Sequence, residues 1–145
     1  MKHYFDTSVF LKAYVNEAES AMVKTIVEGS EQVVTSVLTY AEMRAALGRQ
    51  QRNRRLTVDQ EEQAAGQLDR DFGTWPLVGL TQVLAHEAGR LAARHALTGA
   101  DAVHLASALQ FAASTGETVI FWSADDRLVR AARREGLRIG RLGPV

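Results

Sequence analysis

Three carboxylates of this chain stand where a strand is expected to end or a helix to begin, and a fourth lies within the helix that follows a strand. Asp6 directly follows a short, apolar, β-forming segment, and Glu42 lies in the helix expected after the second strand. Asp101 opens a helix late in the chain, and Asp125 follows the most apolar segment of the sequence. In an open parallel α/β sheet the strands end at one edge, where ligands bind between diverging connections. We therefore predict that the four carboxylates face one crevice.

Carboxylates gathered in a desolvated site repel one another, and a bound cation allows them to remain ionised together. Oxygen ligands in an open site favour Mg²⁺ or Mn²⁺. Two such ions about 3.5 to 4 Å apart would bind phosphate oxygens, activate water and stabilise the leaving group. The sequence therefore predicts a site for one or two ions, and the reaction that this site favours is phosphodiester hydrolysis.

Other hydrolytic chemistries lack the residues that they need. The chain contains no cysteine, which excludes a thiolate nucleophile, a disulfide framework and a zinc–thiolate site. The sequence also lacks a glycine-rich phosphate loop with its lysine, so nucleotide triphosphate hydrolysis of that kind is disfavoured. Any metal must be held by oxygen or imidazole.

Two of the acids also have a purely structural interpretation. Glu42 could be a surface residue that pairs with a neighbouring arginine on its helix. Asp101 stands three residues after Thr98, so it could complete a helix cap or complement the helix dipole. His104, one helical turn further on, is expected to be a hydrogen-bonded packing residue rather than a ligand.

Asp125 has no such interpretation at this stage. Ser123 is expected to cap the following helix, and Asp126, three residues later, is expected to complete that cap. Asp125 shares a helix face with Leu128 and Ala132, which we predict to be buried. We therefore expect Asp125 to point inward.

The elements that must position these residues alternate along the chain. Short strands are predicted near residues 4–5, 32–35, 77–80, 118–122 and 137–139. Helical segments separate them, which predicts an α/β fold with three layers, in which helices flank a mainly parallel central sheet of about five short strands.

The helix that carries Glu42 is expected to follow Ser36 as its cap. Its predicted inward positions are Leu38, Ala41 and Ala45. The arginine-rich stretch 48–56 is expected to loop out after this helix. Thr57 and Gln60 have the spacing of a capping box, which predicts a helix from there to about Phe72.

Length and composition are those of a soluble globular domain. The chain has 145 residues, of which 46% are hydrophobic and 23% charged, and we expect residues 1–145 to form a single domain with one core. No apolar segment approaches the ~18 residues of a membrane span, and the amino end lacks the apolar stretch of a signal peptide. We therefore expect a cytoplasmic protein with no membrane partner.

Arginine is unevenly distributed, although the formal net charge is zero. Two clusters hold most of the arginines, namely Arg44, Arg49, Arg52, Arg54 and Arg55, and then Arg127, Arg130, Arg133, Arg134, Arg138 and Arg141. The planar guanidinium donates two hydrogen bonds to one phosphate, so one interpretation is a polyanionic partner. The other is a solvated helix face.

Taken in order, four short motifs resemble those of PIN-domain ribonucleases, in particular the VapC toxins of bacterial toxin–antitoxin pairs. The motifs are Tyr4–Lys12, Thr35–Ser36 through Ala41–Glu42, Ala100–Ala108, and Ser123–Asp125 with Leu128 and Ala131–Ala132. The resemblance spans essentially the whole chain, and all four acidic positions are filled.

The resemblance implies a PIN-like fold and a Mg²⁺- or Mn²⁺-dependent endoribonuclease that cleaves structured RNA, such as tRNA or rRNA, and inhibits translation. It implies that Asp6 and Asp101 are the principal metal ligands. Glu42 and Asp125 would complete the acidic pocket directly or through water.

The resemblance also implies partners and supporting residues. Ser8 and Ser123 match small hydroxyl positions that support the pocket in the family. Such toxins are usually homodimers held inactive by a cognate VapB-type antitoxin, in heterotetramers or larger assemblies. Arg44, Arg49 and Arg52 are our candidates for contact with RNA or antitoxin.

Three alternatives remain open at this point. A phospho-acceptor receiver domain needs a lysine late in the chain, and no lysine follows Lys24. A non-catalytic RNA-binding module on the same fold would bind RNA without metal. If the acids served only as helix caps, Asp6→Asn and Asp101→Asn would change stability and leave any nuclease activity intact.

Overall fold

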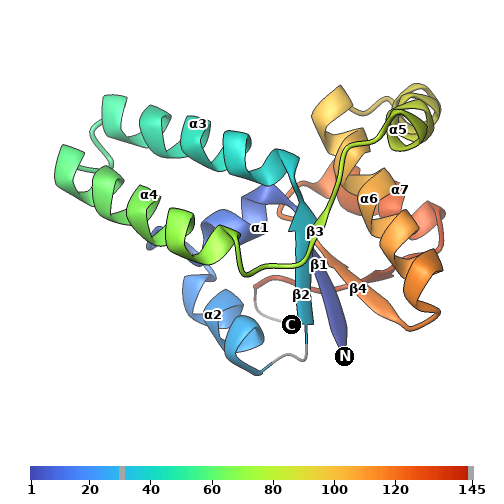
Figure 1. Cartoon of the computed structure of the whole chain (residues 1–145), viewed down its shortest axis with the longest axis horizontal. Coiled ribbons are helices and arrows are strands. Elements are labelled where there is room, and N and C mark those ends of the chain that lie inside the picture. Colours follow the sequence, from blue (N-terminus) through green and yellow to red (C-terminus); the bar gives the residue numbers. More distant parts are fainter. Residues whose placement is uncertain (30–31, 144–145) are drawn as a thin grey trace.

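The structure is a computed structural model that describes residues 1–29 and 32–143. Its strands are β1 (Lys2–Phe5), β2 (Gln32–Ser36), β3 (Leu77–Val78), β4 (Val119–Trp122) and β5 (Arg138–Ile139). Its helices are α1 (Thr7–Leu11), α2 (Ser20–Gly29), α3 (Leu38–Arg52), α4 (Val58–Phe72), α5 (Gln82–His95), α6 (Gly99–Thr115) and α7 (Asp126–Arg134). Strands alternate with helices along the chain (Figure 1), which confirms the predicted α/β class.

Within the described residues, the five strands form one sheet in the order β3-β2-β1-β4-β5. Every pair is parallel, so the carboxyl ends of all strands lie along one edge. β1 is central, and its Tyr4 lies opposite Val34 of β2 and Phe121 of β4. The chain proceeds from β1 to one side of the sheet and later returns to the other side, so the strand order reverses at β1. Ligands bind at such a position in open α/β sheets.

Helices cover both faces of the sheet, in the three layers that the sequence predicts (Figure 1). Tyr4 packs with residues of α5, α6 and α7. The next residue, Phe5, points to the opposite face and packs with residues of α1, α2, α3 and α4. Because both faces are covered, β4 is apolar throughout, and the polar residues His3, Thr35 and Ser36 of β1 and β2 are buried.

The helix α3 differs from its prediction in length and in buried face. Residues 48–52 are helical rather than part of a loop, since arginine and glutamine are good helix formers and this end of α3 packs against α4. The buried positions are Thr39, Met43, Ala46 and Leu47, instead of the predicted Leu38, Ala41 and Ala45. Thr39 is buried because its hydroxyl lies 2.7 Å from the hydroxyl of Thr35 in β2, a pairing that apolar periodicity does not reveal.

Side-chain caps begin two helices at the predicted residues. Thr57 and Gln60 form a capping box at the start of α4. Thr98 accepts a hydrogen bond from the backbone N–H of Asp101 at the start of α6. Each cap satisfies backbone donors that have no partner within the helix, and the second cap also fixes the turn that carries Asp101.

Gly140 allows the segment after β5 to lie against the end of β4. A Cβ atom at this position would stand 2.2 Å from two atoms of the Trp122 indole. The backbone N–H of Gly140 donates to Phe121 at 2.9 Å, and the carbonyl of Trp122 accepts from the N–H of Asp6 at 3.1 Å. The glycine therefore lets β5 support the end of β4, which in turn lies beside the end of β1.

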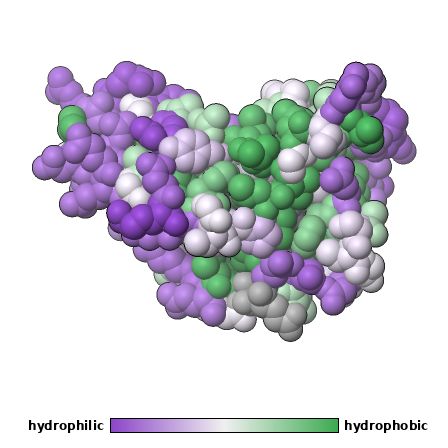
Figure 2. Space-filling view, in the orientation of Figure 1, coloured by the Kyte–Doolittle hydropathy of each residue, from purple (hydrophilic) through white to green (hydrophobic). Residues whose placement is uncertain are grey.

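The outer surface is unevenly polar. In Figure 2, hydrophilic residues cover the arm formed by α3 and α4, and hydrophobic residues gather over the centre, below a hollow between this arm and the side of α5. Exposed large apolar residues near β3 and the start of α5 include Leu77, Leu80 and Val83. Among the helices described, none combines the length and apolar character that a membrane crossing requires.

Candidate active site

The four predicted carboxylates line one cavity of about 390 Å³ at the carboxyl edge of the sheet. Asp6 comes from the end of β1, Glu42 from α3, Asp101 from α6 and Asp125 from the start of α7. The other residues around this cavity are Thr7, Ser8, Leu11, Ala45, Ala46, Arg49 and His104. Segments far apart in sequence thus contribute acids to one space.

Asp6 is the most enclosed of these acids, with 4% of its surface exposed. One carboxylate oxygen accepts hydrogen bonds from the Ser8 hydroxyl at 2.6 Å and the Val9 N–H at 3.1 Å, so Asp6 caps α1. The other accepts from the Ser123 hydroxyl at 2.5 Å. Burial raises the pKa of Asp6, while His104 and these donors oppose the rise. The carboxylate is therefore oriented by donors from both β1–α1 and β4–α7.

Glu42 is held by a buried network of polar side chains. Its Oε1 atom accepts from the Thr7 hydroxyl at 2.6 Å and lies 2.7 Å from Nε2 of His104. Nδ1 of His104 is in turn 2.9 Å from the Tyr4 hydroxyl. Burial raises the pKa of Glu42, but the bonds from His104 and Thr7 outweigh it and leave the net pKa below its ordinary value. Glu42 is thus an oriented and readily ionised carboxylate.

His104 is the hydrogen-bonded packing residue that the sequence predicts. It is 2% exposed and links Tyr4 on the sheet to Thr7 and Glu42. The surface-pair interpretation of Glu42 is wrong, because its partners are a buried histidine and a threonine instead of an arginine. What the sequence misses is that Thr7 and Tyr4 belong to this network. The one signal is the position of Thr7, directly after Asp6.

Asp101 is half-buried, and the charges of the neighbouring acids affect its pKa. Burial raises its pKa, and the negative charges of Asp125 and Asp6 raise it further. Thr98 accepts from the backbone N–H of Asp101, and a side-chain hydrogen bond from Thr98, together with the charge of His104, opposes the rise in the pKa of Asp101. Burial and the two neighbouring acids thus both disfavour the ionised form of Asp101.

The role of Asp125 differs from its prediction. Asp125 itself caps α7, because its carboxylate accepts from the Leu128 N–H at 3.0 Å. It is exposed rather than buried, since a capping residue precedes the first helical turn and does not follow the face of the helix. Ser123 instead accepts from the Asp125 N–H at 3.0 Å, and Asp126 lies in the first turn.

Ser8 and Ser123 join the two ends of the site. Besides donating to Asp6, Ser8 accepts from the Ala124 N–H at 3.0 Å, and Ser123 accepts from the Asp125 N–H. Each hydroxyl therefore connects the Asp6 carboxylate to the loop after β4. This double role explains why small hydroxyl residues suit both positions.

The donor set of the cavity suits a hard divalent cation. Its acids offer oxygen atoms, and the raised pKa of Asp101 shows that added positive charge would be favourable there. In the part of the chain that is described, no group of three or more Asp, Glu and His side chains is already arranged around one ion position.

Of the three arginines proposed as contacts, one lies at the cavity. Arg49 of α3 is among the lining residues. Arg44 is exposed, and its guanidinium donates to the Tyr40 hydroxyl at 3.0 Å, which in turn donates to Asp69 of α4. Arg52 is exposed at the end of α3 and is not a lining residue.

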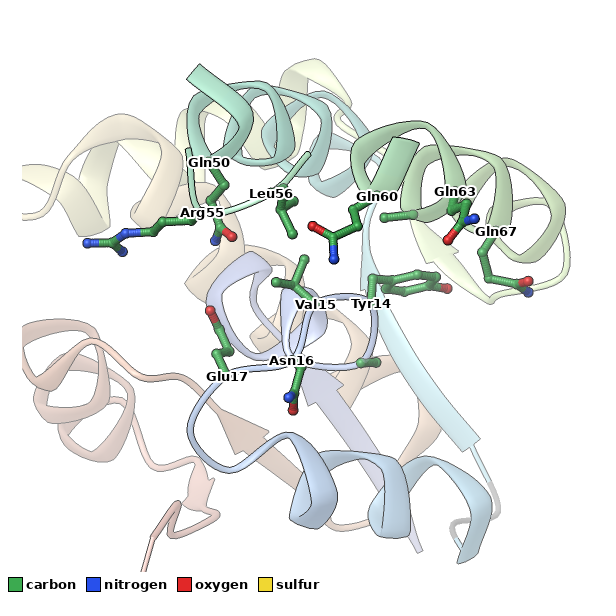
Figure 3. Close-up of a pocket in the computed structure, with 12 residues that line it drawn as sticks. Tyr14, Val15, Asn16, Glu17, Gln50, Arg55, Leu56, Gln60, Gln63 and Gln67 are labelled. Atoms are coloured by element: carbon green, nitrogen blue, oxygen red, sulfur yellow. The ribbon is translucent and has the colours of Figure 1, made fainter. Parts of the chain in front are cut away.

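A larger cavity of about 590 Å³ lies beneath the α3–α4 arm (Figure 3). Its walls carry amide side chains from α3 and α4, namely Gln50, Gln60, Gln63 and Gln67. Glu17 and Arg55 are the charged residues among its described lining. The described lining of this larger cavity includes no cluster of acids. Metal-assisted hydrolysis requires such a cluster, so the smaller cavity with four acids is the better candidate for the active site.

Comparison with known proteins agrees with this architecture. A family model described as the PIN domain matches residues 3–134. Ribonuclease VapC45 and Ribonuclease VapC49 of Mycobacterium tuberculosis are each 38% identical to the chain over 136 residues, which is 94% of this chain and 92% of each relative.

Solved structures share the fold at low sequence identity. FitAcB from Neisseria gonorrhoeae superposes with a TM-score of 0.70 at 16% identity, and the match covers 96% of both chains. The sarcin–ricin loop cleaving toxin VapC20 of Mycobacterium tuberculosis gives a TM-score of 0.65 at 19% identity, over 93% of this chain and 95% of that one. Since the family model spans nearly the whole chain and full-length relatives match it, this chain belongs to the PIN-domain family.

Proposed function

We propose that this chain is a divalent-metal-dependent endoribonuclease, the toxin of a toxin–antitoxin pair, which hydrolyses phosphodiester bonds in structured RNA such as tRNA or rRNA and inhibits translation. The observation that carries this proposal is the cavity lined by Asp6, Glu42, Asp101 and Asp125. Two relatives at 38% identity that are named ribonucleases support it. The match of the family model to residues 3–134 supports a single nuclease domain over residues 1–145.

Asp6 and Asp101 would hold one or two Mg²⁺ or Mn²⁺ ions, with Glu42 and Asp125 completing the ligand set directly or through water. When bound, such an ion supplies positive charge to the phosphate oxygens and makes water more acidic. Asp6 is fixed for this role by Ser8 and Ser123.

The remaining side chains of the cavity orient Glu42. Its bonds from Thr7 and His104 leave the second carboxylate oxygen free to face the cavity or a water molecule there. Oriented carboxylates in a fixed site reduce the reorganisation needed when charge develops on the phosphate. The role of His104 is therefore to position Glu42, through a contact that is already present in the protein alone.

An antitoxin is the partner that the solved neighbours favour. One neighbour is a toxin–antitoxin complex from Klebsiella pneumoniae, and another is VapBC2 from Rickettsia felis bound to a promoter DNA fragment. By analogy, we propose that a VapB-type antitoxin holds this chain inactive and that both act in the cytoplasm. The homodimer and the larger assemblies with antitoxin stay predictions of the family resemblance.

The test is cleavage of purified tRNA and rRNA by the isolated chain with Mg²⁺, with Mn²⁺ and with EDTA. We expect cleavage with either ion and none with EDTA. Asp6→Asn and Asp101→Asn should each lower the rate at least about hundredfold, because each removes a charged ligand worth several kcal/mol to the transition state.

The matched control is Glu62→Gln, which removes an exposed carboxylate from α4, away from the cavity. This variant should cleave like the wild type, and circular dichroism should show that all variants are folded. Cleavage that persists in EDTA, or in folded Asp6→Asn and Asp101→Asn, would contradict the proposal. Metal-independent RNA binding without cleavage would favour the non-catalytic module instead.

A further inference from the structure

A second cavity of about 430 Å³ adjoins the proposed active site. Asp101 and Asp125 line both cavities, so these two acids form the wall between them. Beyond that wall the second cavity is lined by Thr98, Asp126, Arg127 and Arg130. A ligand bound at the acids can therefore extend into a space that presents two guanidinium groups.

The two guanidinium groups are available to a ligand. Arg127 and Arg130 stand three residues apart on α7, and both are exposed. Over residues 1–29 and 32–143, neither forms an ion pair with an acid. Arg127 donates to the carbonyl of Ala96 at 3.4 Å, which leaves most of its donors unused. These donors can bind an anion, although the same cavity is also lined by the carboxylates of Asp101, Asp125 and Asp126.

The start of α7 does not itself supply this site. Asp125 already caps its backbone N–H groups, and Asp126 adds negative charge to its first turn. A small free anion would also meet the charges of Asp101 and Asp125 across the cavity. The cavity therefore favours an anion that is tethered to a group bound at the acids, rather than a separate phosphate ion.

We propose that Arg127 and Arg130 bind the RNA phosphate next to the one that is cleaved. This inference rests on the proposed function. A phosphodiester chain meets the requirement because its successive phosphates are covalently joined, so that one can lie at the metal-binding acids while its neighbour reaches the guanidinium groups. Arg49 lines the candidate active-site cavity. An RNA strand that passes over the acids would therefore have Arg49 on one side of them and Arg127 and Arg130 on the other.

The experiment measures binding of a fluorescein-labelled RNA hairpin with a single-stranded loop by fluorescence anisotropy, with Ca²⁺ in place of Mg²⁺ and over a series of salt concentrations. The Arg127→Ala/Arg130→Ala double variant should bind about tenfold more weakly than wild type, because charge-assisted hydrogen bonds to phosphate are lost. The slope of log affinity against log salt should fall by about 0.7, the value for one phosphate contact on a single strand.

Arg133→Ala/Arg134→Ala is the matched control. These arginines also lie exposed on α7, and neither lines the second cavity. The control should keep the wild-type affinity and slope. Alanine is a strong helix former, so both double variants should fold.

The outcomes separate this inference from the function on which it rests. If wild type binds and cleaves RNA, while the Arg127→Ala/Arg130→Ala variant keeps its affinity and slope, the phosphate site is wrong and the nuclease stands. Equal losses in both double variants would indicate a general charge effect and would also overturn the site. Loss of antitoxin binding with unchanged RNA binding would assign the arginines to the other partner. If wild type neither binds nor cleaves RNA, both proposals fail.

Discussion

At the scale of the residue, the charge of Asp101 opposes stability in the absence of metal. Burial and the charges of Asp125 and Asp6 raise its pKa above the ordinary value of 3.8. A raised folded-state pKa contributes stability that is fully present below the unfolded pKa and is lost as pH rises through the folded pKa. Near neutral pH the ionised group therefore destabilises the fold.

We accordingly expect Asp101→Asn to stabilise the metal-free protein near neutral pH, by about 0.5 to 1 kcal/mol after allowance for solvent screening of this half-exposed group. Urea denaturation in EDTA measures the difference, and the gain should shrink as pH falls through the raised pKa of Asp101, because the wild-type carboxyl then protonates. Glu62→Gln should change stability little at either pH. A less stable Asp101→Asn variant at neutral pH would show that Asp101 makes favourable contacts which outweigh the repulsion.

The same scale shows what the sequence reveals about the site. The convergence of Asp6, Glu42 and Asp101 on one cavity is predictable from their places after strands and in the following helices, because backbone topology alone brings such positions to one edge. The network around Glu42 is not found, since its bond to His104 spans 62 positions of sequence. Its existence depends on how α3 and α6 pack across the sheet.

At the scale of the element, caps both stabilise helices and aim site residues. Thr57 and Thr98 each accept a backbone N–H at a helix start, but only the helix after Thr98 carries a site acid in its first turn. Thr57→Ala and Thr98→Ala should each lower the free energy of unfolding by about 1 kcal/mol. Only Thr98→Ala should also slow RNA cleavage, because the turn that carries Asp101 loses its cap.

The test is to measure thermal or urea unfolding and the rate of RNA cleavage for both variants. Equal rates for Thr57→Ala and Thr98→Ala would mean that packing of α6 places Asp101 without help from the cap. If Thr57→Ala slowed cleavage as much as Thr98→Ala, the effect would reflect general destabilisation, since Thr57 lies outside both cavities near the acids.

The starts of α4 and α6 are predictable, whereas the end and buried face of α3 and the cap of α7 are not. The capping boxes and Thr caps depend on side chains within one turn, so the local sequence contains the information. The end of α3 depends on its packing against α4, and its buried face includes Thr39 because a hydroxyl in β2 pairs with it. At α7, Asp125 rather than Ser123 became the cap because Ser123 is committed to Asp6 and to the backbone.

At the scale of the whole molecule, the parallel strand order brings acids that are distant in sequence to one cavity. The central position of β1 between β2 and β4 places Asp6 next to the loop that carries Ser123 and Asp125. The alternation of strands and helices was sufficient to predict this edge. The second cavity, with Arg127 and Arg130, was not predictable, since its walls come from the starts of α6 and α7 as they lie in space.

This convergence predicts how the whole protein responds to metal and pH. An ion that binds only the folded chain stabilises it, by about 2.7 kcal/mol when its concentration is a hundred times the dissociation constant. We therefore expect saturating Mg²⁺ or Mn²⁺ to raise the melting temperature by several degrees near neutral pH, and EDTA to reverse the rise. The shift should disappear near pH 4, because ligands must be ionised to bind.

The signs of the pKa shifts specify the order of events. In the metal-free protein Asp6 and Asp101 have raised pKa values, so these two should protonate before Glu42 as pH falls, and protons then compete with the ion for them. Glu42 has a lowered pKa, so its contribution to stability is present above its ordinary value of 4.5 and is lost only as pH falls through the lower folded value. Asp101→Asn should lack most of the metal-induced shift at every pH. A full shift in that variant, or a shift in wild type that persists near pH 4, would place the metal away from these acids.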